Sequence, residues 1–348
     1  MPSLSAANGV ASFLLNYLER MQDADLSFTV LAGENDASPF RIRALERLSV
    51  PLFFLPSVQT VGLNGFRRAV AEFFRAHHDF DAVYNNAENQ SLFLFLEARR
   101  YGIPARILHA HATRASGKPL RALRNRLLVK LAAPLVTHRA ACSCAAGRAL
   151  FGRRVFRVFE NAVDAREFRF REDVRKKTRA AIGVSDTTML YGFVGRFSPQ
   201  KNIPFFLSLA ERLRGTDTRI LMVGEGEERE AFTAEALRRG LSDRFILLSP
   251  ASDVASLYFA MDALLLPSHF EGLPVVAVEA QLSGLPCLLS DAITRETAFS
   301  PLTLFLDRFD TEAWVAALPK MPCRVNAYNA RFDITVAAKR MEAFLLSL

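Results

Sequence analysis

Hydrophobic positions in the first half of the chain follow two spacings in turn. Helical spacing marks residues 10–21 (VASFLLNYLERM) and 66–77, whereas short apolar runs mark residues 26–33 (LSFTVLAG) and 82–86. Apolar residues three and four apart form one face of a helix, and short runs bounded by Gly or Asn are typical of buried strands. This alternation predicts βαβ units and therefore a parallel sheet.

The same alternation restarts after about residue 180. A strand at 188–196 (TMLYGFVGR) precedes a helix at 202–215 and a strand at 218–226, and the pattern continues to residue 291. We therefore expect an α/β protein with two Rossmann-like, doubly wound domains in tandem. The first domain spans residues 1–165 and the second spans 166–332. A helix at about 333–348 is expected to cross back and pack on the first domain.

The first domain lacks an opening strand. Parallel α/β domains normally begin with a buried apolar strand, but residues 1–9 (MPSLSAANG) contain no apolar run. Only the loop that would follow such a strand, ending in Asn8 and Gly9, is present. We expect either that the natural reading frame starts upstream with a short strand, or that the chain folds poorly at this end.

Composition narrows the class of protein. A chain of 348 residues that is 50% hydrophobic suits two globular domains. The four cysteines form no CxxC pair and no zinc spacing, which argues against a disulfide framework and favours a reducing cytoplasm. No run of eighteen apolar residues occurs, and the first residues lack the basic and apolar regions of a signal peptide.

Positive charge is concentrated in one block. Between Glu97 and Glu160 there is no Asp or Glu, while Lys and Arg contribute fourteen charges to a chain whose net charge is +8. Such a block indicates an anionic partner: nucleic acid, lipid headgroups or a diphosphate-bearing substrate. A solvated basic face with no partner is the alternative.

Three predicted strand ends in the second domain carry candidate binding residues. Ligands of α/β domains lie at the carboxyl ends of the strands, where glycine lets the backbone approach and helix N-termini face anions. In GFVGRFSPQKN, Gly195 ends the strand, and Arg196 and Lys201 are suited to hold a phosphate. In LMVGEGEERE, Gly224 and Gly226 allow a tight turn, which is a weak signal by itself.

The third strand end is SHFEGLPVVAVEAQLSG, residues 268–284. Pro274 suits the first position of a helix that Gly284 ends, and the amides before and after it are expected to face an anion. Glu271 precedes this helix and Glu279 lies in its second turn. A carboxylate among apolar residues needs hydrogen-bond donors, and ribose hydroxyls would supply them to Glu279. The spacing suits a sugar at one end, phosphates between, and a ribose at the other.

These segments together resemble the nucleotide-binding domain of family 4 retaining glycosyltransferases. Members of that family have the GT-B fold, in which two Rossmann-like domains face each other across a cleft, and a signature of Glu, seven residues, then Glu. HAHATRA (109–115), ACSCAAGRALFG (141–152) and FENAVDAREFRF (159–170) also resemble the bacterial exopolysaccharide and capsule subgroup. The similarity runs from about residue 9 to the end.

The resemblance implies roles for particular residues. Glu271 would contact donor-sugar hydroxyls and Glu279 the ribose, while Arg196 and Lys201 would hold the diphosphate and stabilise the departing nucleotide. His109 or His111 would reach the transferred sugar. We expect neither a metal nor another cofactor, because no DxD-like carboxylate pair is placed for one. The remaining donor-binding residues would be Gly195, Gly224, Gly272, Leu273 and Pro274.

The family also implies an acceptor side in the first domain. Acceptors in polysaccharide assembly are often lipid-linked saccharides, and the donor is expected to be a UDP-linked hexose or N-acetylhexosamine. The loop that ends in Gly9 would contact the acceptor. Residues 119–136 alternate basic and apolar side chains in a way that suits a helix on an anionic bilayer, so we expect peripheral association with the inner face of the plasma membrane. The basic positions are Arg121, Arg124, Arg126 and Lys130.

Two departures and three alternatives stay open. ENAVD replaces the commoner PNGVD at the domain junction, and LLSPASD stands where the family often has a glycine, which leaves the hinge and the base-binding loop uncertain. A nucleotide-sugar-binding protein without transferase activity is one alternative, and an epimerase of similar fold is another. Nucleic acid as the anionic partner lacks the aromatic platforms or recognition motif that would support it.

Overall fold

The computed structural model divides the chain into two units. It describes residues 4, 9–22, 24–34, 38–113, 119–250, 253–318 and 324–348. Unit 1 comprises Met1–Ala162 and Ile334–Leu348, and unit 2 comprises Val163–Asp333. The sequence placed the boundaries at 165 and 332, three residues and one residue away from these positions.

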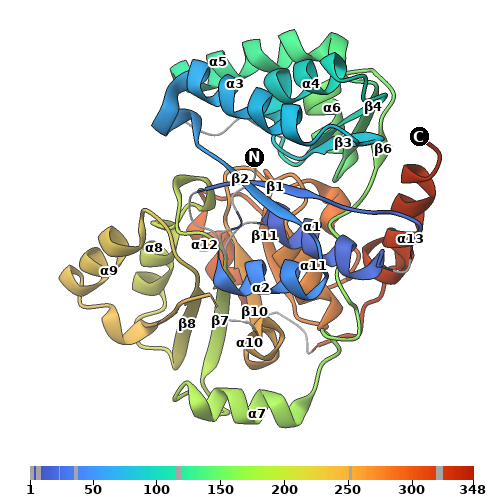
Figure 1. Ribbon diagram of the computed structural model, residues 1–348. Helices are drawn as coiled ribbons and strands as arrows, with labels where there is room; N and C mark the ends of the chain where they lie inside the picture. The colour runs from blue at the N-terminus through green and yellow to red at the C-terminus, as the bar shows by residue number, and fades with distance from the viewer. Residues whose placement is uncertain are drawn as a thin grey trace. The chain divides into compact units, whose positions relative to one another are not determined.

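Unit 2 contains a six-stranded parallel sheet among its described residues. The strand order is β12-β11-β10-β7-β8-β9, so β7, the first in sequence, lies inside the sheet and the chain winds outward on both sides of it. Figure 1 shows β7, β8 and β10 side by side. The strands are β7 (Met189–Val194), β8 (Thr218–Val223), β9 (Phe245–Leu248), β10 (Ala263–Leu266), β11 (Cys287–Ser290) and β12 (Thr303–Leu306).

Helices alternate with these strands. Helix α12 packs beside α8, α10 packs beside α7, and α11 packs against β10 and β11. The helices are α7 (Glu172–Ala181), α8 (Phe205–Arg212), α9 (Arg229–Arg238), α10 (Val254–Ala260), α11 (Val275–Leu282) and α12 (Thr311–Ala317), with short 3₁₀ turns η3 (Pro199–Lys201), η4 (Ser242–Arg244), η5 (Arg295–Thr297) and η7 (Ala330–Phe332). All four residues of β10 and all four of β11 are buried, because helices cover both faces of a parallel sheet.

Arginines fix the end of α10 and the start of β10. The Asp262 carboxylate accepts hydrogen bonds from the Leu190 amide at 2.7 Å and from Arg175 at 2.6 Å, and it pairs with the buried Arg179. Arg324 donates to the carbonyls of Tyr258 and Met261, each at 2.6 Å. Cations at a helix C-terminus satisfy its last carbonyls, so the final turn of α10 is held in place.

Gln281 joins α11 to the segment that leads into β12. Its side-chain oxygen accepts from the amides of Phe299 at 2.9 Å and Ser300 at 3.0 Å, and from the Thr303 hydroxyl at 2.9 Å. Its side-chain nitrogen donates to the Thr297 carbonyl at 2.9 Å. Gln281 is fully buried, so this one amide satisfies polar groups that water does not reach.

The described residues of unit 1 form two parallel sheets. The first pairs β1 (Val30–Gly33) with β2 (Leu52–Leu55). The second has the order β3-β4-β5-β6, with β3 (Ala82–Asn85), β4 (Ala105–Ala110), β5 (His138–Ala141) and β6 (Arg157–Val158). The segment 1–8, where the sequence predicts that an opening strand is missing, lies outside the described residues apart from Leu4. The predicted strand at 26–33 is shorter than expected, because only its last four residues pair.

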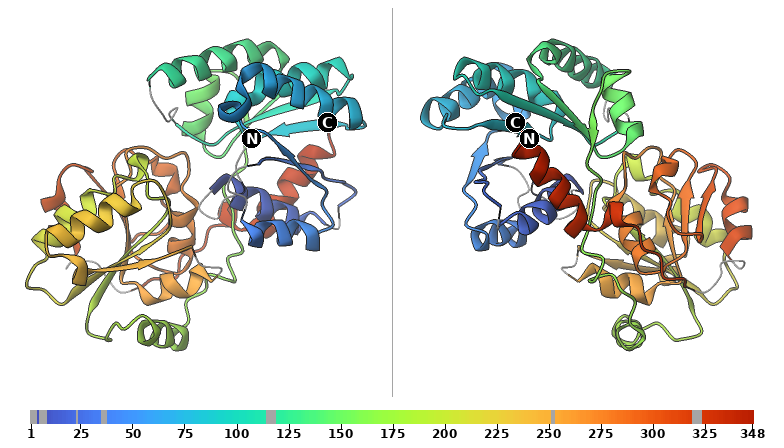
Figure 2. Two further views of the ribbon diagram at one scale, coloured as in Figure 1. Left: turned by 60° about the vertical axis from the view of Figure 1, so that its left-hand side comes forward. Right: turned by 90° about the vertical axis from the view of Figure 1, so that its right-hand side faces the viewer.

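Helix α1 links the two sheets of unit 1. Phe13 and Tyr17 pack in a core with residues of β4 and of the C-terminal helix α13, whereas Ala11 and Leu15 pack with residues of β1 and α2. Figure 2 shows α13 alongside α1 in both views. The helices are α1 (Gly9–Arg20), α2 (Pro39–Arg47), α3 (Val58–Ala76), α4 (Ser91–Arg100), α5 (Pro119–Ala132), α6 (Cys144–Phe151) and α13 (Ile334–Leu345), with 3₁₀ turns η1 (Glu88–Gln90) and η2 (Ala133–Leu135). Among the helices described, none has both the length and the apolar composition needed to cross a membrane.

The Gln281 contacts lead to a stability prediction. Gln281→Met keeps the volume of the side chain but leaves several buried donors and acceptors without partners, so we expect a loss of about 2–4 kcal/mol in the free energy of unfolding. Urea unfolding followed by circular dichroism measures this loss. Gln59→Met, at an exposed position on α3, serves as the control and should change stability by less than about 0.5 kcal/mol. Equal, small effects of the two substitutions would contradict the structural role of Gln281.

Candidate functional site

Three loops meet at the carboxyl ends of β7, β8 and β10 in unit 2. The Phe197 amide donates to the Glu225 carbonyl at 2.9 Å, which joins the loop after β7 to the loop after β8. The His269 amide donates to the Gln200 carbonyl at 2.8 Å, which joins the loop after β7 to the loop after β10. The three strand ends selected from the sequence therefore lie together in one place.

Gly224 and Gly226 are required by the backbone at this junction. Both have φ values near +152°, and a Cβ atom at Gly224 would lie 1.9 Å from the Gly195 carbonyl oxygen. A Cβ at Gly226 would lie 2.3 Å from the Phe197 carbonyl oxygen. The close approach of the β7 and β8 loops thus depends on glycine at both positions. The two glycines noted in the sequence are therefore explained by this close approach of the backbone.

Lys201, in the loop after β7, and Glu271, in the loop after β10, form an ion pair. Lys201 Nζ lies 2.5 Å from Glu271 Oε1, and the side chains are 15% and 9% exposed. Gln200 Nε2 lies 3.3 Å from Glu271 Oε2 and 3.0 Å from the Phe270 carbonyl oxygen. Pairing with a cation and an amide offsets the cost of burying the carboxylate. The sequence identified Lys201 and Glu271 separately but did not predict that they would pair.

Arg196 makes a much more exposed contact. Its Nε lies 3.1 Å from Glu227 Oε2, and the two side chains are 58% and 53% exposed. Exposed pairs of this kind contribute about 0–1 kcal/mol, so the Arg196 guanidinium can exchange this partner for another anion at small cost. Glu227 was not among the residues expected from the sequence.

Helix α11 begins one residue later than predicted. Pro274 has φ −68° and ψ 115°, and this extended ψ angle is not helical. Pro274 is therefore the N-cap residue, and Val275 is the first residue of the helix. The Pro274 carbonyl accepts the first helical bond from Ala277 at 3.1 Å. Gly272, Leu273 and Pro274 are buried between Glu271 and the helix. Gly284, with φ +72°, follows the C-cap residue as the sequence predicted.

Glu279 lies on α11 with a partner that the sequence did not indicate. The buried Tyr258 hydroxyl donates to Glu279 Oε2 at 2.7 Å. Burial raises the pKa of Glu279 to about 7; the Tyr258 hydrogen bond acts in the opposite direction, and the charge of Glu167 adds to the increase. Glu279 therefore changes protonation near neutral pH, unlike an ordinary surface glutamate.

Two stacked histidines lie at the end of β4 in unit 1. The rings of His109 and His111 are 4.0 Å apart at an interplanar angle of 24°, and Phe13 meets both rings edge-on. His109 is fully buried and its Nδ1 lies 2.8 Å from the Tyr84 hydroxyl. His111 is half-buried and its Nε2 lies 2.8 Å from Asn86 Oδ1. Of the two candidates, only His111 retains partial solvent exposure.

Burial keeps both imidazoles neutral. It lowers the pKa of His111 to about 3, and burial together with the neighbouring His111 holds the pKa of His109 well below its usual value. Glu88, on η1 after β3, has the opposite response: burial raises its pKa to about 7, while a hydrogen bond from the His111 backbone amide opposes the increase. Unit 1 thus presents neutral hydrogen-bonding groups at this strand end.

The basic positions of the 119–136 segment lie on α5. Arg126 and Lys130 are exposed, and Arg124 donates to the Asn125 side chain at 2.9 Å. Arg121 belongs to the same helix, but its side chain lies outside the described residues. Three leucines one helical turn apart are also exposed: Leu123 (66%), Leu127 (57%) and Leu131 (53%). Gly9 is exposed and is the first residue of α1.

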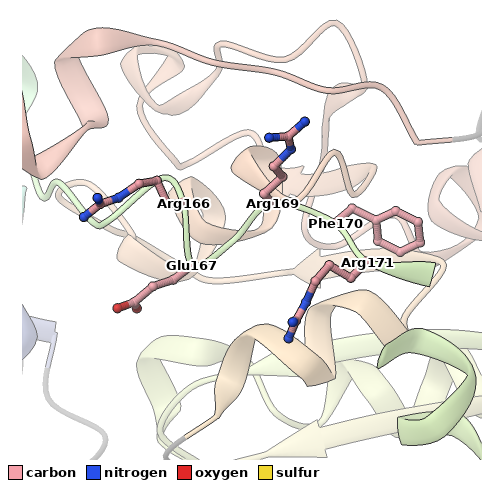
Figure 3. A pocket seen from close by; sticks show the side chains of 5 residues that line it. All are labelled: Arg166, Glu167, Arg169, Phe170 and Arg171. Carbon is pink, nitrogen blue, oxygen red and sulfur yellow. The ribbon is translucent and has the colours of Figure 1, made fainter. Parts of the chain in front are cut away.

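A pocket lies on the segment before α7. It is lined by Arg166, Glu167, Arg169, Phe170 and Arg171. Figure 3 shows the side chains of the three arginines pointing in different directions, so they do not converge on one anion. Arg166 is held by Asp164 at 2.7 Å. In the described parts of the chain, no group of three or more His, Cys, Asp or Glu side chains could hold a metal ion.

Comparison with known proteins finds glycosyltransferases as relatives of this chain. The family model for glycosyl transferases group 1 matches residues 174–320. The putative glycosyltransferase EpsF of Bacillus subtilis is 31% identical over 297 residues, which cover 83% of this chain and 77% of EpsF. The UDP-Gal:alpha-D-GlcNAc-diphosphoundecaprenol alpha-1,3-galactosyltransferase of Escherichia coli is 30% identical over 142 residues, 38% of this chain and 36% of that enzyme.

Solved structures show the same fold. Anabaena HepE in complex with UDP-glucose matches with a TM-score of 0.80 over 97% of this chain and 96% of its own, at 20% identity. A sucrose-phosphate synthase from Thermosynechococcus elongatus matches with a TM-score of 0.70 over 95% of this chain and 87% of its own. Both likenesses establish the GT-B fold. Taken with the identity to EpsF over most of the chain, they show that the protein belongs to the group 1 glycosyltransferases.

Proposed function

We propose that the protein is a retaining, metal-independent glycosyltransferase that uses a UDP-linked hexose or N-acetylhexosamine. The acceptor is a lipid-linked saccharide or a growing polysaccharide in exopolysaccharide or capsule synthesis. One observation carries the donor side of this proposal: the buried Lys201–Glu271 pair and Glu279 lie at opposite ends of the segment that begins α11. Glu271 is suited to the sugar at one end, Lys201 to the phosphates, and Glu279 to the ribose at the other end.

The donor is proposed to bind at the three strand-end loops of unit 2. Lys201 and Arg196 meet the diphosphate, and Glu271 accepts hydrogen bonds from sugar hydroxyls. Glu279 accepts from the ribose. As the glycosidic bond to the diphosphate breaks, negative charge accumulates on the leaving oxygen, and fixed cations stabilise it without reorganisation. Glu271 holds Lys201 in position before the donor arrives, which reduces the cost of ordering a flexible side chain at the transition state.

The relatives support the choice of substrates. HepE was solved with UDP-glucose, and the name of the E. coli enzyme specifies UDP-galactose as donor and a diphosphoundecaprenol-linked sugar as acceptor. We assign the same classes, a UDP-sugar and a lipid-linked saccharide, to this chain. In unit 1 we assign His111 to the transferred sugar, because His109 is enclosed in the core. The loop that ends in Gly9 is assigned to the acceptor.

The exposed face of α5 is proposed to rest on an anionic membrane. We call Leu123, Leu127, Leu131, Arg126 and Lys130 the leucine face. Leucines four residues apart lie on one side of a helix, and the two cations lie beside them. Apolar side chains that enter the lipid boundary, with basic side chains at the headgroups, are typical of helices that lie on a bilayer. This face would place the enzyme at the cytoplasmic leaflet, where lipid-linked acceptors are found.

Substitution of the two acids tests the donor assignment. Glu279→Ala should weaken UDP binding about 10- to 100-fold, because the ribose loses a charged acceptor. Glu271→Gln should leave UDP affinity within about threefold, since it frees Lys201 for phosphate, but should lower turnover of UDP-sugar at least about 100-fold. Titration calorimetry and transfer of a labelled sugar to a diphosphate-linked lipid acceptor measure the two effects.

Glu230→Gln, at an exposed position on α9, is the matched control and should change neither quantity. Equal loss of UDP affinity in both site variants would contradict the division of roles. Binding of UDP-sugars with neither transfer nor hydrolysis would instead favour the non-catalytic binding protein. Recovery of the donor with altered stereochemistry would favour an epimerase.

The raised pKa of Glu279 predicts how donor affinity depends on pH. Ribose hydroxyls donate to the ionised carboxylate better than to the neutral acid, so binding competes with protonation. Affinity for UDP-glucose, whose diphosphate does not titrate near neutrality, should rise as pH increases from 6 to 8, with its half-maximal value near pH 7 and little change above about pH 8. Glu279→Gln should bind more weakly and with little change over this range. A wild-type affinity that is constant from pH 6 to 8 would refute the assignment.

Sedimentation with vesicles tests the leucine face. The wild-type protein should sediment with vesicles that contain anionic lipid at low salt. Replacing Leu123, Leu127 and Leu131 together by Ser should reduce binding at least about tenfold, because it removes the apolar contribution. Leu237→Ser, at an exposed leucine on α9 in unit 2, is the control. Failure of the wild-type protein to sediment would exclude the membrane assignment while leaving the donor site unaffected.

A further inference from the structure

We propose that Tyr258 is a positioning residue for Glu279: its hydroxyl holds one carboxylate oxygen so that the other is presented to the nucleoside hydroxyls. This inference rests on the proposed function, which assigns Glu279 to the ribose. It adds a residue from α10, outside the loops that contact the ligand. Tyr258 acts through Glu279 and need not touch the donor.

The two carboxylate oxygens of Glu279 differ in their hydrogen bonding. Tyr258 donates to Oε2 at 2.7 Å. Among the residues that the structure describes, Oε1 receives no hydrogen bond from the protein, and the side chain is only half-buried. A ligand hydroxyl can therefore reach Oε1, whereas Oε2 already has a donor. The carboxylate is thus held with one oxygen toward the protein and one toward the site.

Tyr258 is itself fixed on several sides. It is fully buried, and its ring packs against that of Phe168 at a centroid distance of 6.1 Å. Arg324 binds the Tyr258 carbonyl at 2.6 Å and so holds the backbone that carries the ring. A buried tyrosine that is fixed at both its backbone and its ring cannot follow the carboxylate if the carboxylate turns. The hydroxyl therefore determines the orientation of Glu279, and not the reverse.

The electrostatic surroundings of Glu279 give the hydroxyl a second effect. Burial and the charge of Glu167, on the segment before α7, both favour the neutral acid, and Tyr258 is the group that favours the ionised form. Cys287 on β11 acts on the pKa of Tyr258, and Arg324 acts on that of Cys287. Loss of the hydroxyl would thus leave Glu279 both less well oriented and less ionised at neutral pH.

Ribose discrimination provides the test. Wild-type protein should bind UDP about 10- to 30-fold more tightly than the weaker of 2′-deoxy-UDP and 3′-deoxy-UDP, since one charge-assisted hydrogen bond is lost. In Tyr258→Phe this ratio should fall below about threefold, and the pH midpoint of UDP-glucose binding should move upward by about one unit. Titration calorimetry at several pH values measures both. A purely structural role would lower thermal stability without changing either.

Tyr191→Phe is the matched control. Tyr191 lies on β7 and is 4% exposed, and its hydroxyl has no hydrogen-bond partner among the described residues, so both the ratio and the midpoint should match wild type. A double-mutant cycle tests whether Tyr258 acts through the acid. In a Glu279→Gln background, Tyr258→Phe should cause no further loss of discrimination, because the shared interaction is already removed.

The outcomes separate the two levels of the proposal. If wild-type protein binds no UDP, the proposed function fails. Suppose that wild-type protein binds UDP more tightly than its deoxy analogues, and that Tyr258→Phe keeps both this affinity ratio and the pH midpoint of UDP-glucose binding. Only the role of Tyr258 is then overturned. If Tyr258→Phe does not fold, Tyr258→Met, which also lacks the hydroxyl and leaves Glu279 intact, makes the same test. Unchanged discrimination in that variant would also overturn the inference.

Discussion

The buried contact between Lys201 and Glu271 connects the parts of the donor site. It joins the loop after β7 to the loop after β10, and Gln200 adds two further bonds between the same loops. A carboxylate in this location is tolerable only with a cation beside it, since an unpaired buried charge costs several kcal/mol. The pair therefore fixes both loops in the absence of ligand. The loops of the candidate site are therefore already joined to one another without a ligand.

The parts of the fold that depend on local pattern could be predicted from the sequence. Apolar runs gave β7, β8 and β10, and the spacing around Pro274 gave α11 within one residue, because burial and helix starts leave local signals. The residues that depend on distant contacts could not be predicted in this way. Tyr258 is 21 positions from Glu279 and reads as an ordinary apolar helix residue until the fold places the two together. Gln200 and Asn86 carry no chemical signature beyond that of a loop amide.

The two units deal with buried polar groups in different ways. In the candidate site of unit 2, Glu271 contacts the cation Lys201 and Glu279 accepts from the Tyr258 hydroxyl. In unit 1, burial keeps His109 and His111 neutral, and their rings stack on each other. His109 is hydrogen-bonded to Tyr84, and His111 is hydrogen-bonded to Asn86. Sequence inspection recognised both histidines but could not choose between them. The choice follows from burial, which depends on how α1 packs against β4.

The close backbone approach at Gly224 and Gly226 separates fixed from variable positions in the loop after β8. Any side chain at either glycine would collide with the carbonyl of Gly195 or Phe197, so these two positions are closed to substitution. Glu225 lies between the two glycines, and Glu227 follows the second. Their side chains are at least half exposed and make only surface contacts. The side chains of this loop can therefore be replaced without altering the backbone that the two glycines fix.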